Sequence, residues 1–135
     1  MTIVSPLTAT AYVALGGAIG AVGRYQLGRL MTHMLGVKTV TTFPWATLTA
    51  NVVGSLAMGL LAGWMARAGQ GGEPMRLLLG VGLLGGFTTF SAFSLEMMLL
   101  IERGQISLAL TYAAVSLFAG LAALYIGLIV MRVAA

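Results

Sequence analysis

The residues of this chain that could do chemistry are concentrated in one ten-residue stretch, GGFTTFSAFS, from Gly85 to Ser94. Strongly apolar sequence precedes it (Leu77–Leu84) and follows it (Met97–Ile101). In hydrocarbon, a helix break survives only where the freed backbone groups are buried in protein or line a wet path. Gly85 and Gly86 are able to break a helix, and the neighbouring hydroxyls are able to bind the freed groups. The stretch therefore predicts a break at mid-membrane that serves a binding site or a pore.

Two aromatic residues of this stretch, Phe90 and Phe93, are three positions apart and project within roughly 60° of each other on a helix. Such a pair is usually core. Here it follows the predicted break and alternates with hydroxyls, and the positive edge of a phenyl ring can help to hold an anion that has shed its water. Glu96 lies about one turn beyond, where its carboxylate either tunes a vestibule or pairs with an arginine.

Polar residues in two other apolar segments also fall at helical spacings. Thr47, Asn51, Gly54 and Ser55 form one stripe. Asn51 either bonds a neighbouring helix or faces an aqueous vestibule, where its amide could donate two hydrogen bonds to an anion.

A second series repeats at intervals of four residues: Tyr112, Ser116 and Gly120. Serine in membrane helices often bonds its own backbone, so this series is as compatible with packing as with a polar lining.

The first apolar segment contains Gly16, Gly20 and Gly23 at helical neighbour spacings, which favours close helix packing. A nucleotide-binding loop is not expected here, because no strand precedes these glycines and they lie inside a membrane span. Arg24 follows them and either snorkels to the interface or is buried and paired. A structural or topological role is favoured over ligand contact.

Composition indicates an all-α membrane protein with a single domain over residues 1–135. Hydrophobic residues make up 59% and charged residues 7% of the chain, with a mean hydropathy of +1.01, whereas soluble domains have about 25% charged residues. About twenty apolar residues cross a bilayer. The predicted spans are Leu7–Leu35, Phe43–Ala66, Met75–Ile101 and Ser107–Met131, joined by short loops at Gly36–Thr42, Gly69–Pro74 and Glu102–Ile106.

Catalysis finds no support in the sequence. There is no cysteine, and no Ser–His–Asp set, metal-ligand spacing or pair of intramembrane carboxylates is present. The single histidine, His33, is interpreted as an interfacial residue. The N-terminus has neither a basic region nor a small-residue cleavage site, so a removable signal peptide is not expected.

The basic residues give almost no orientation bias. Three of them fall on the side of the termini (Arg67, Arg76, Arg132) and four on the opposite side (Arg24, Arg29, Lys38, Arg103). Short-loop Lys and Arg residues normally set orientation, so the balance predicts copies inserted in both directions. The alternative is that chain context or Arg24 alone decides.

In these motifs the chain resembles the Fluc-type fluoride channels of bacteria. The resemblance rests on GGAIGAVGRY in the first span, NVVGSLAMG (Asn51–Gly59) in the second and GGFTTFSAFS in the third. It implies a four-helix protomer with a broken third helix, assembled as an antiparallel homodimer with two pores in the bacterial inner membrane. It also implies passive export of cytoplasmic fluoride, which protects against fluoride toxicity.

The resemblance further implies roles for particular residues. The phenylalanine box matches Phe90 and Phe93, the vestibule asparagine matches Asn51, the polar track matches Tyr112 and Ser116 with Thr89 and Glu96 nearby, the first-helix arginine matches Arg24, and the carbonyls that hold a central Na+ match Gly85 and Thr88. The chain departs from the family pattern at Gly120, where a hydroxyl could otherwise continue the track.

Two other functions compete. A coupled small multidrug exporter is also a four-helix, dual-topology dimer, but it is expected to carry a carboxylate in its first span, and this chain has none there. A non-transporting assembly factor would use the polar residues only for helix packing.

Overall fold

The computed structural model describes residues 4–68 and 72–134, and the regular elements in these two ranges are all helices. Four segments are long and apolar enough to span a membrane: Pro6–Leu35, Trp45–Arg67, Glu73–Glu102 and Ile106–Val133. The predicted four-span, all-helical organisation is therefore confirmed, with bounds shifted by a few residues.

The first two elements are α1 (Pro6–Leu35) and α2 (Val37–Thr42). The Ser5 hydroxyl accepts a hydrogen bond from the Thr8 N–H at the start of α1, and Gly36, at φ +82°, ends it. The prediction of a plain loop over Gly36–Thr42 is wrong, because residues 37–42 form the short helix α2. Helix α3 (Trp45–Ala68) carries the second span.

The third span is made of four consecutive elements: α4 (Glu73–Met75), the π-helix η1 (Arg76–Leu84), α5 (Gly85–Phe87) and α6 (Phe90–Glu102). Of the predicted loop Gly69–Pro74, residues 69–71 lie outside the described ranges, and Glu73 and Pro74 already belong to α4. A tight connection with Gly104 at φ +72° leads to α7 (Ile106–Val133).

The backbone of the third span leaves helical dihedral angles at Thr88 and Thr89, which are both extended. The interruption lies inside the predicted stretch Gly85–Ser94 but three residues beyond the two glycines, because Gly85 and Gly86 belong to α5 and Gly85 has φ −64° and ψ −37°. The reason is a close helix contact. A Cβ added to Gly86 would lie 2.6 Å from the Gly17 carbonyl oxygen of α1, so this glycine permits an approach instead of a break.

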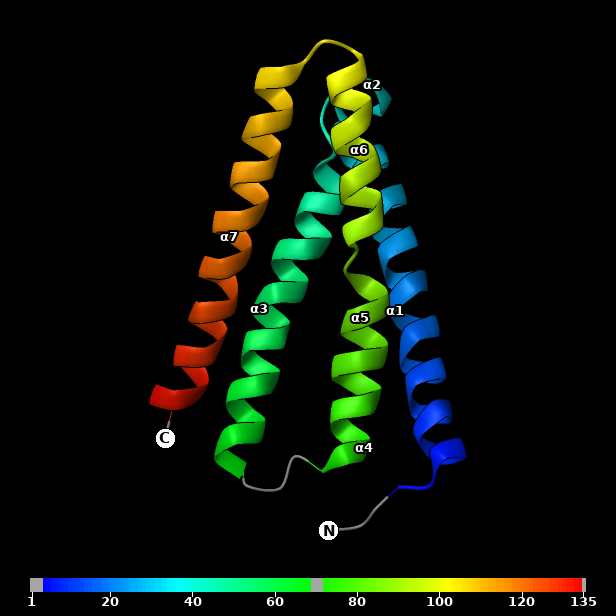
Figure 1. The fold of residues 1–135 in the computed structure, drawn as a ribbon, viewed down its shortest axis with the longest axis vertical. Coiled ribbons are helices and arrows are strands. Elements are labelled where there is room, and N and C mark those ends of the chain that lie inside the picture. Colours follow the sequence, from blue (N-terminus) through cyan, green and yellow to red (C-terminus); the bar gives the residue numbers. More distant parts are fainter. Residues whose placement is uncertain (1–3, 69–71, 135) are drawn as a thin grey trace.

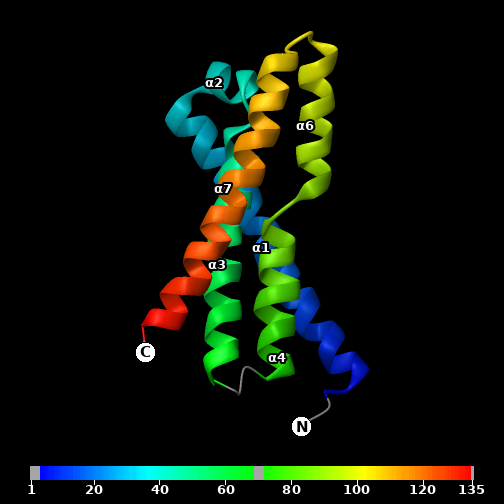
Figure 2. The same ribbon diagram turned by 60° about the vertical axis from the view of Figure 1, so that its left-hand side comes forward.

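The helices pack as two pairs that lie side by side. Helix α7 runs along α3, while α1 runs along η1 and α5 (Figure 1). Both termini lie at the end that carries the α3–α4 connection, as expected for an even number of spans. Figure 2 shows the extended link between α5 and α6 from a second side, with α2 standing out beside the other end of the bundle.

Glycines set the closest contacts of both pairs. A Cβ on Gly16 would collide with the Leu78 carbonyl oxygen of η1, and one on Gly20 with that of Leu83. In the other pair, a Cβ on Gly59 of α3 would collide with the backbone of α7. The prediction of close packing through the first-span glycines is confirmed at Gly16 and Gly20.

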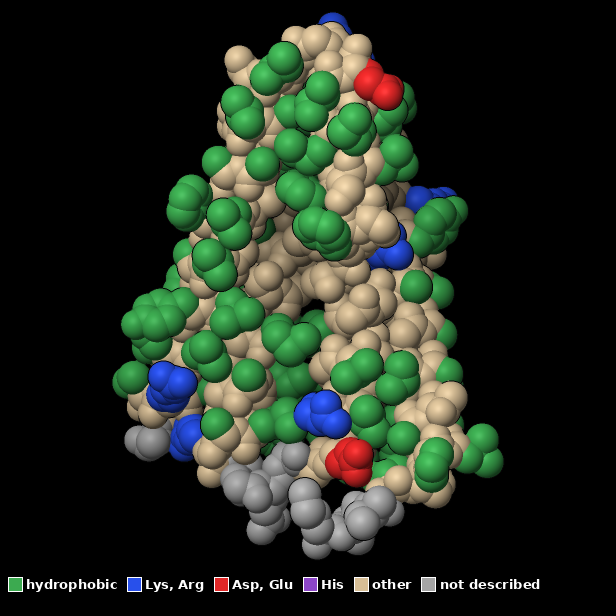
Figure 3. Space-filling model, in the orientation of Figure 1, with side chains coloured by type: hydrophobic (Ala, Val, Ile, Leu, Met, Phe, Trp, Pro, Cys, Tyr) green, Lys and Arg blue, Asp and Glu red, His purple; other side chains and the backbone are tan. Residues whose placement is uncertain are grey.

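The described part of the chain has a small core and a large apolar surface. Its main buried cluster contains Leu48, Leu100, Ala109 and Tyr112. Hydrophobic side chains spread from end to end of the face in Figure 3, where acidic side chains occur only near the upper and lower ends. Such a surface is suited to lipid or to another protein chain instead of water.

Candidate functional site

The extended residue Thr89 is held by Asn51 of α3. The Asn51 Nδ2 donates to the Thr89 carbonyl (3.1 Å), and the Thr89 N–H donates to the Asn51 Oδ1 (2.8 Å). The Thr89 hydroxyl also accepts from the Ala92 N–H (3.2 Å), which caps the first turn of α6. Both backbone polar groups of a non-helical residue thus find partners inside the protein, as a low-dielectric setting requires.

This clamp limits what Asn51 has left to offer a ligand. An amide group has two N–H donors, and one of them is occupied by the Thr89 carbonyl. The sequence-based idea that Asn51 donates both hydrogens to an anion is therefore wrong for this arrangement, because one hydrogen is needed to hold the backbone. One donor remains, next to an open cavity.

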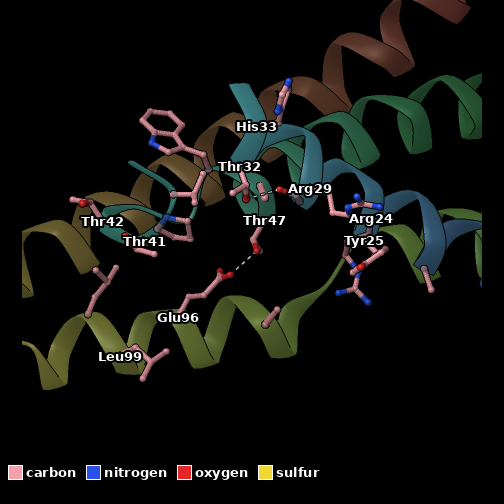
Figure 4. Close-up of a pocket in the computed structure, with 18 of the residues that line it drawn as sticks. Arg24, Tyr25, Arg29, Thr32, His33, Thr41, Thr42, Thr47, Glu96 and Leu99 are labelled. Carbon is pink, nitrogen blue, oxygen red and sulfur yellow. Dashed lines mark hydrogen bonds between the residues drawn. The ribbon is translucent and has the colours of Figure 1, made fainter. Parts of the chain in front are cut away.

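A second cluster forms around Glu96 on α6. The Thr47 hydroxyl donates to one carboxylate oxygen (2.6 Å), and the Tyr112 hydroxyl donates to the other (2.8 Å). Figure 4 shows Glu96 reaching across to Thr47. Of the two sequence-based readings, pairing with an arginine is not seen among the described residues, where the hydrogen-bond partners of the carboxylate are these two hydroxyls. The sequence placed Thr47 in the polar stripe but did not identify it as a partner of Glu96.

Aromatic rings connect this cluster to the interruption of the third span. The ring centroids of Phe90 and Phe93 are 5.8 Å apart, and those of Phe93 and Tyr112 are 5.0 Å apart. The ring of Phe43, which the sequence did not single out, also packs edge-to-face with that of Tyr112, with the centroids 5.3 Å apart. Tyr112 is completely buried, whereas Phe90 is 79% exposed. The series therefore leads from the protomer's core to its surface.

Two cavities adjoin these groups. The larger, of about 930 Å³, lies between α1, α2, α6 and the start of α3 (Figure 4). Its charged and titratable lining residues are Arg24, Tyr25, Arg29, His33, Glu96 and Arg103. The smaller, of about 300 Å³, lies beside the interruption, and its lining includes Asn51, Ser55, Thr88, Thr89 and Phe90. Each cavity thus combines polar donors with an aromatic or arginine side chain.

Arg24 also has a structural contact, since its Nε donates to the Gly86 carbonyl at 3.4 Å. This contact links α1 to α5 just before the interruption and agrees with the structural role favoured for Arg24. The same side chain also lines the larger cavity, where it is accessible to a ligand.

The remaining predicted residues fall around the same region. Ser116 on α7 has a buried hydroxyl with no hydrogen-bond partner among the described residues. The carbonyls of Gly85 and Thr88 receive no backbone N–H from the part of the chain that the structure describes. A buried hydroxyl such as that of Ser116 is costly unless a ligand, an ion or a partner chain satisfies it.

Comparison with known proteins gives one consistent answer. The family model described as CrcB-like protein, Camphor Resistance (CrcB), matches residues 11–128. A protein of Novosphingobium aromaticivorans named fluoride-specific ion channel FluC is 62% identical over 126 residues, which cover 93% of this chain and 98% of the relative. Proteins of the same name from Erythrobacter litoralis (53% identity, 98% of both chains) and Rhodospirillum centenum (50% identity, 90% of this chain and 94% of the relative) are also similar.

Replacing Asn51 with leucine should destabilise the protein, because the N–H and the carbonyl of Thr89 then lose their hydrogen-bond partners. Leucine is similar in volume to asparagine, so the packing changes little. We expect a loss of about 1–2 kcal/mol, since hydrogen bonds within membrane proteins contribute modestly even when they are buried. The midpoint of thermal unfolding in detergent measures it.

The matched control is Ser94→Ala, which removes a hydroxyl bonded only to the Phe90 carbonyl of its own helix. It should leave the midpoint nearly unchanged. Equal midpoints for the Asn51 variant and the parent would contradict the clamp.

Proposed function

The chain belongs to the CrcB-like protein family, and we propose that it is a passive, fluoride-selective ion channel that exports cytoplasmic fluoride. It is a multi-pass membrane protein with no enzymatic activity. The observation that carries the proposal is the extended backbone at Thr88 and Thr89, where Asn51 bonds both backbone groups of Thr89 beside a cavity and an exposed phenylalanine. The similarity to proteins named fluoride-specific ion channels selects the ion.

The chemistry of fluoride suits these residues. The ion is small and strongly hydrated, so a narrow path must replace its water with hydrogen-bond donors without trapping it. Asn51 has one free N–H, and the buried hydroxyl of Ser116 has no partner in the described chain. The edges of Phe90 and Phe93 add weak positive potential between such donors. We assign these four residues to the fluoride path, together with Thr89 and Tyr112.

The larger cavity serves as the vestibule of this path. Arg24, Arg29 and Arg103 line it, and a cleft lined mainly by one sign of charge raises the local concentration of counter-ions. Glu96 moderates this field from the cavity wall, where two hydroxyls hold its carboxylate. Arg24 and Glu96 thus tune the charge that an arriving anion meets.

A second copy in the opposite orientation completes the pores, and the interruption of the third span then lies at mid-membrane. Phe90 is 79% exposed in the protomer although it stands beside hydroxyls and a cavity, which supports its contact with another chain. The near-equal division of basic residues between the two ends supports insertion in both directions. Two pores then follow from the two-fold symmetry of the homodimer.

A structural Na+ at the dimer interface would use the freed carbonyls. Hard cations prefer oxygen ligands, and the carbonyls of Gly85 and Thr88 receive no backbone N–H from the described residues. Two antiparallel copies bring four such carbonyls toward one axis. The sodium ion would then satisfy backbone groups that the interrupted helix leaves without partners.

The direction of transport follows from acid–base chemistry. Hydrogen fluoride is a weak acid that crosses the inner membrane uncharged and dissociates at neutral pH. The negative-inside potential drives the trapped anion out through a passive channel, since one elementary charge gains about 2.3 kcal/mol per 100 mV. Neither ATP nor a coupled ion is required.

Purified protein reconstituted in liposomes should release fluoride passively and electrogenically while it retains chloride. A fluoride electrode measures the release after a potassium ionophore removes the opposing potential. Flux that requires a proton gradient would instead identify a small multidrug exporter, and an absence of flux would identify a non-transporting assembly factor.

Replacing Phe90 or Phe93 with isoleucine should slow fluoride release by roughly tenfold, the effect of losing about 1.4 kcal/mol of stabilisation of the dehydrated ion. Isoleucine keeps apolar bulk but has no positive ring edge. Folding should survive, because swaps of similar volume usually cost under about 1.5 kcal/mol. The same liposome assay measures the effect.

Phe118→Ile is the control, because Phe118 is an exposed phenylalanine of α7 that lines neither cavity. Its flux should equal that of the parent. If the Phe90 and Phe93 variants form dimers and conduct like the parent, the assignment of these residues to the fluoride path is wrong, and their rings serve only in packing.

A cysteine appended to the C-terminus should react with membrane-impermeant reagents from both sides of the inner membrane. The chain has no cysteine of its own, so labelling reports this site alone. A cysteine at Gly104, in the connection at the opposite end of the bundle, should give the same two-sided result. Labelling of each site from one side only would exclude dual orientation.

A further inference from the structure

We propose that Ser55 of α3 supplies the hydroxyl that α7 lacks at Gly120, and so acts as an additional fluoride-coordinating residue of the path. The inference rests on the proposed function. It concerns a residue that neither the sequence motifs nor the resemblance assigned to the path.

The first step is the position of the Ser55 hydroxyl. A Cβ added to Gly120 would lie 3.6 Å from the Ser55 Oγ, and among the described residues beyond its own stretch of α7 no other atom would come within 4 Å of it. The side chain of Ser55 therefore occupies the place opposite Gly120 that a larger residue of α7 would face. A hydroxyl is present at this level of the helix pair, but it comes from α3.

The second step is the setting of this hydroxyl. Ser55 lines the smaller cavity together with Asn51 and Thr89, and Leu124, one turn beyond Gly120 on α7, lines the same cavity. Ser116, with its unpartnered hydroxyl, lies one turn before Gly120. Ser55 thus lies opposite the helical turn of α7 that follows Ser116, and it lines the same cavity as Asn51 and Thr89.

The third step is the availability of its proton. The Ser55 hydroxyl donates to the Asn51 carbonyl at 2.7 Å. This carbonyl lies four residues earlier in α3 and is the ordinary acceptor of the Ser55 backbone N–H in an α-helix. Its bond to the hydroxyl is supplementary, and serine hydroxyls rotate to suit their partners. The proton can turn from the carbonyl to an anion in the cavity, and no backbone group is left unpaired.

Thr88 and Thr89 line the same cavity but do not stand opposite Gly120. The Thr88 hydroxyl donates to the Leu84 carbonyl at 2.8 Å, which also accepts the Thr88 backbone N–H. The Thr89 hydroxyl accepts from the Ala92 N–H at the start of α6 and keeps its own proton. Both hydroxyls belong to the interruption of the third span, so the place opposite Gly120 distinguishes Ser55 from them.

Fluoride release from liposomes tests the inference in a set of variants. Ser55→Ala should slow release by about tenfold, because hydrogen bonds to charged groups are roughly twice as strong as neutral ones. Adding Gly120→Ser to this variant should restore most of the flux, because it places a hydroxyl at the same level from the opposite helix. A purely structural bond between Ser55 and its own helix would not be rescued from α7.

Two further variants make the test independent of Ser55→Ala folding. Gly120→Ala places a methyl group against the Ser55 hydroxyl and should slow release, whereas Gly120→Ser differs by one oxygen and should not. Thr10→Ala is the control for a hydroxyl bonded to the carbonyl four residues earlier, and it should conduct like the parent.

The outcomes separate this inference from the proposed function. A parent protein that releases no fluoride would overturn both. A conducting parent with an equally fast Ser55→Ala variant, with no rescue by Gly120→Ser, or with equal fluxes for the two Gly120 variants, would overturn the role of Ser55 alone.

Discussion

The structure depends on the pair of hydrogen bonds between the Asn51 side chain and the backbone of Thr89. An extended residue inside an apolar span has an N–H and a carbonyl that no helix satisfies, and hydrocarbon offers no substitute. Asn51 has one acceptor and one donor in one plane, which matches these two groups. With this pairing, the third span can change direction between α5 and α6 without an unsatisfied amide. The position of α6, and of every side chain on it, follows from that junction.

Helix α3 acts as the fixed element that positions the rest. Thr47 holds Glu96, Asn51 holds Thr89, and Gly54 leaves room for Thr88, since a Cβ on Gly54 would collide with the Thr88 methyl group. Thr47, Asn51 and Gly54 recur at helical intervals on one face of α3, so this face contacts the third span at three successive positions. Gly59 lets α3 pack closely on α7, the helix that carries Tyr112. The ring series and the carboxylate cluster are consequences of this arrangement.

The sequence predicted those features that depend on pattern along one helix. The four spans, the polar stripe of α3 and the glycine contacts of α1 follow from hydropathy and from periods of three and four residues. Features that depend on two helices were missed. Gly85 and Gly86 have the composition of a helix break, but whether a glycine breaks a helix or admits a neighbour depends on where α1 lies. The π-helix η1 and the Thr47–Glu96 bond have the same origin, because neither has a signature within its own segment.

Polar groups in this region divide into those that hold the backbone and those that remain free for an ion. One hydrogen of Asn51 and the hydroxyl oxygen of Thr89 are used at the junction, and the hydroxyls of Thr47 and Tyr112 are used on Glu96. What remains is one amide hydrogen of Asn51, the hydroxyl protons of Thr89 and Ser116, and the exchangeable hydroxyls of Ser55 and Thr88. Few donors are therefore left, and they belong to different helices, which disfavours a tight cage around a dehydrated anion. A conducting path needs such sparse coordination, because an ion that is bound by many convergent donors does not leave.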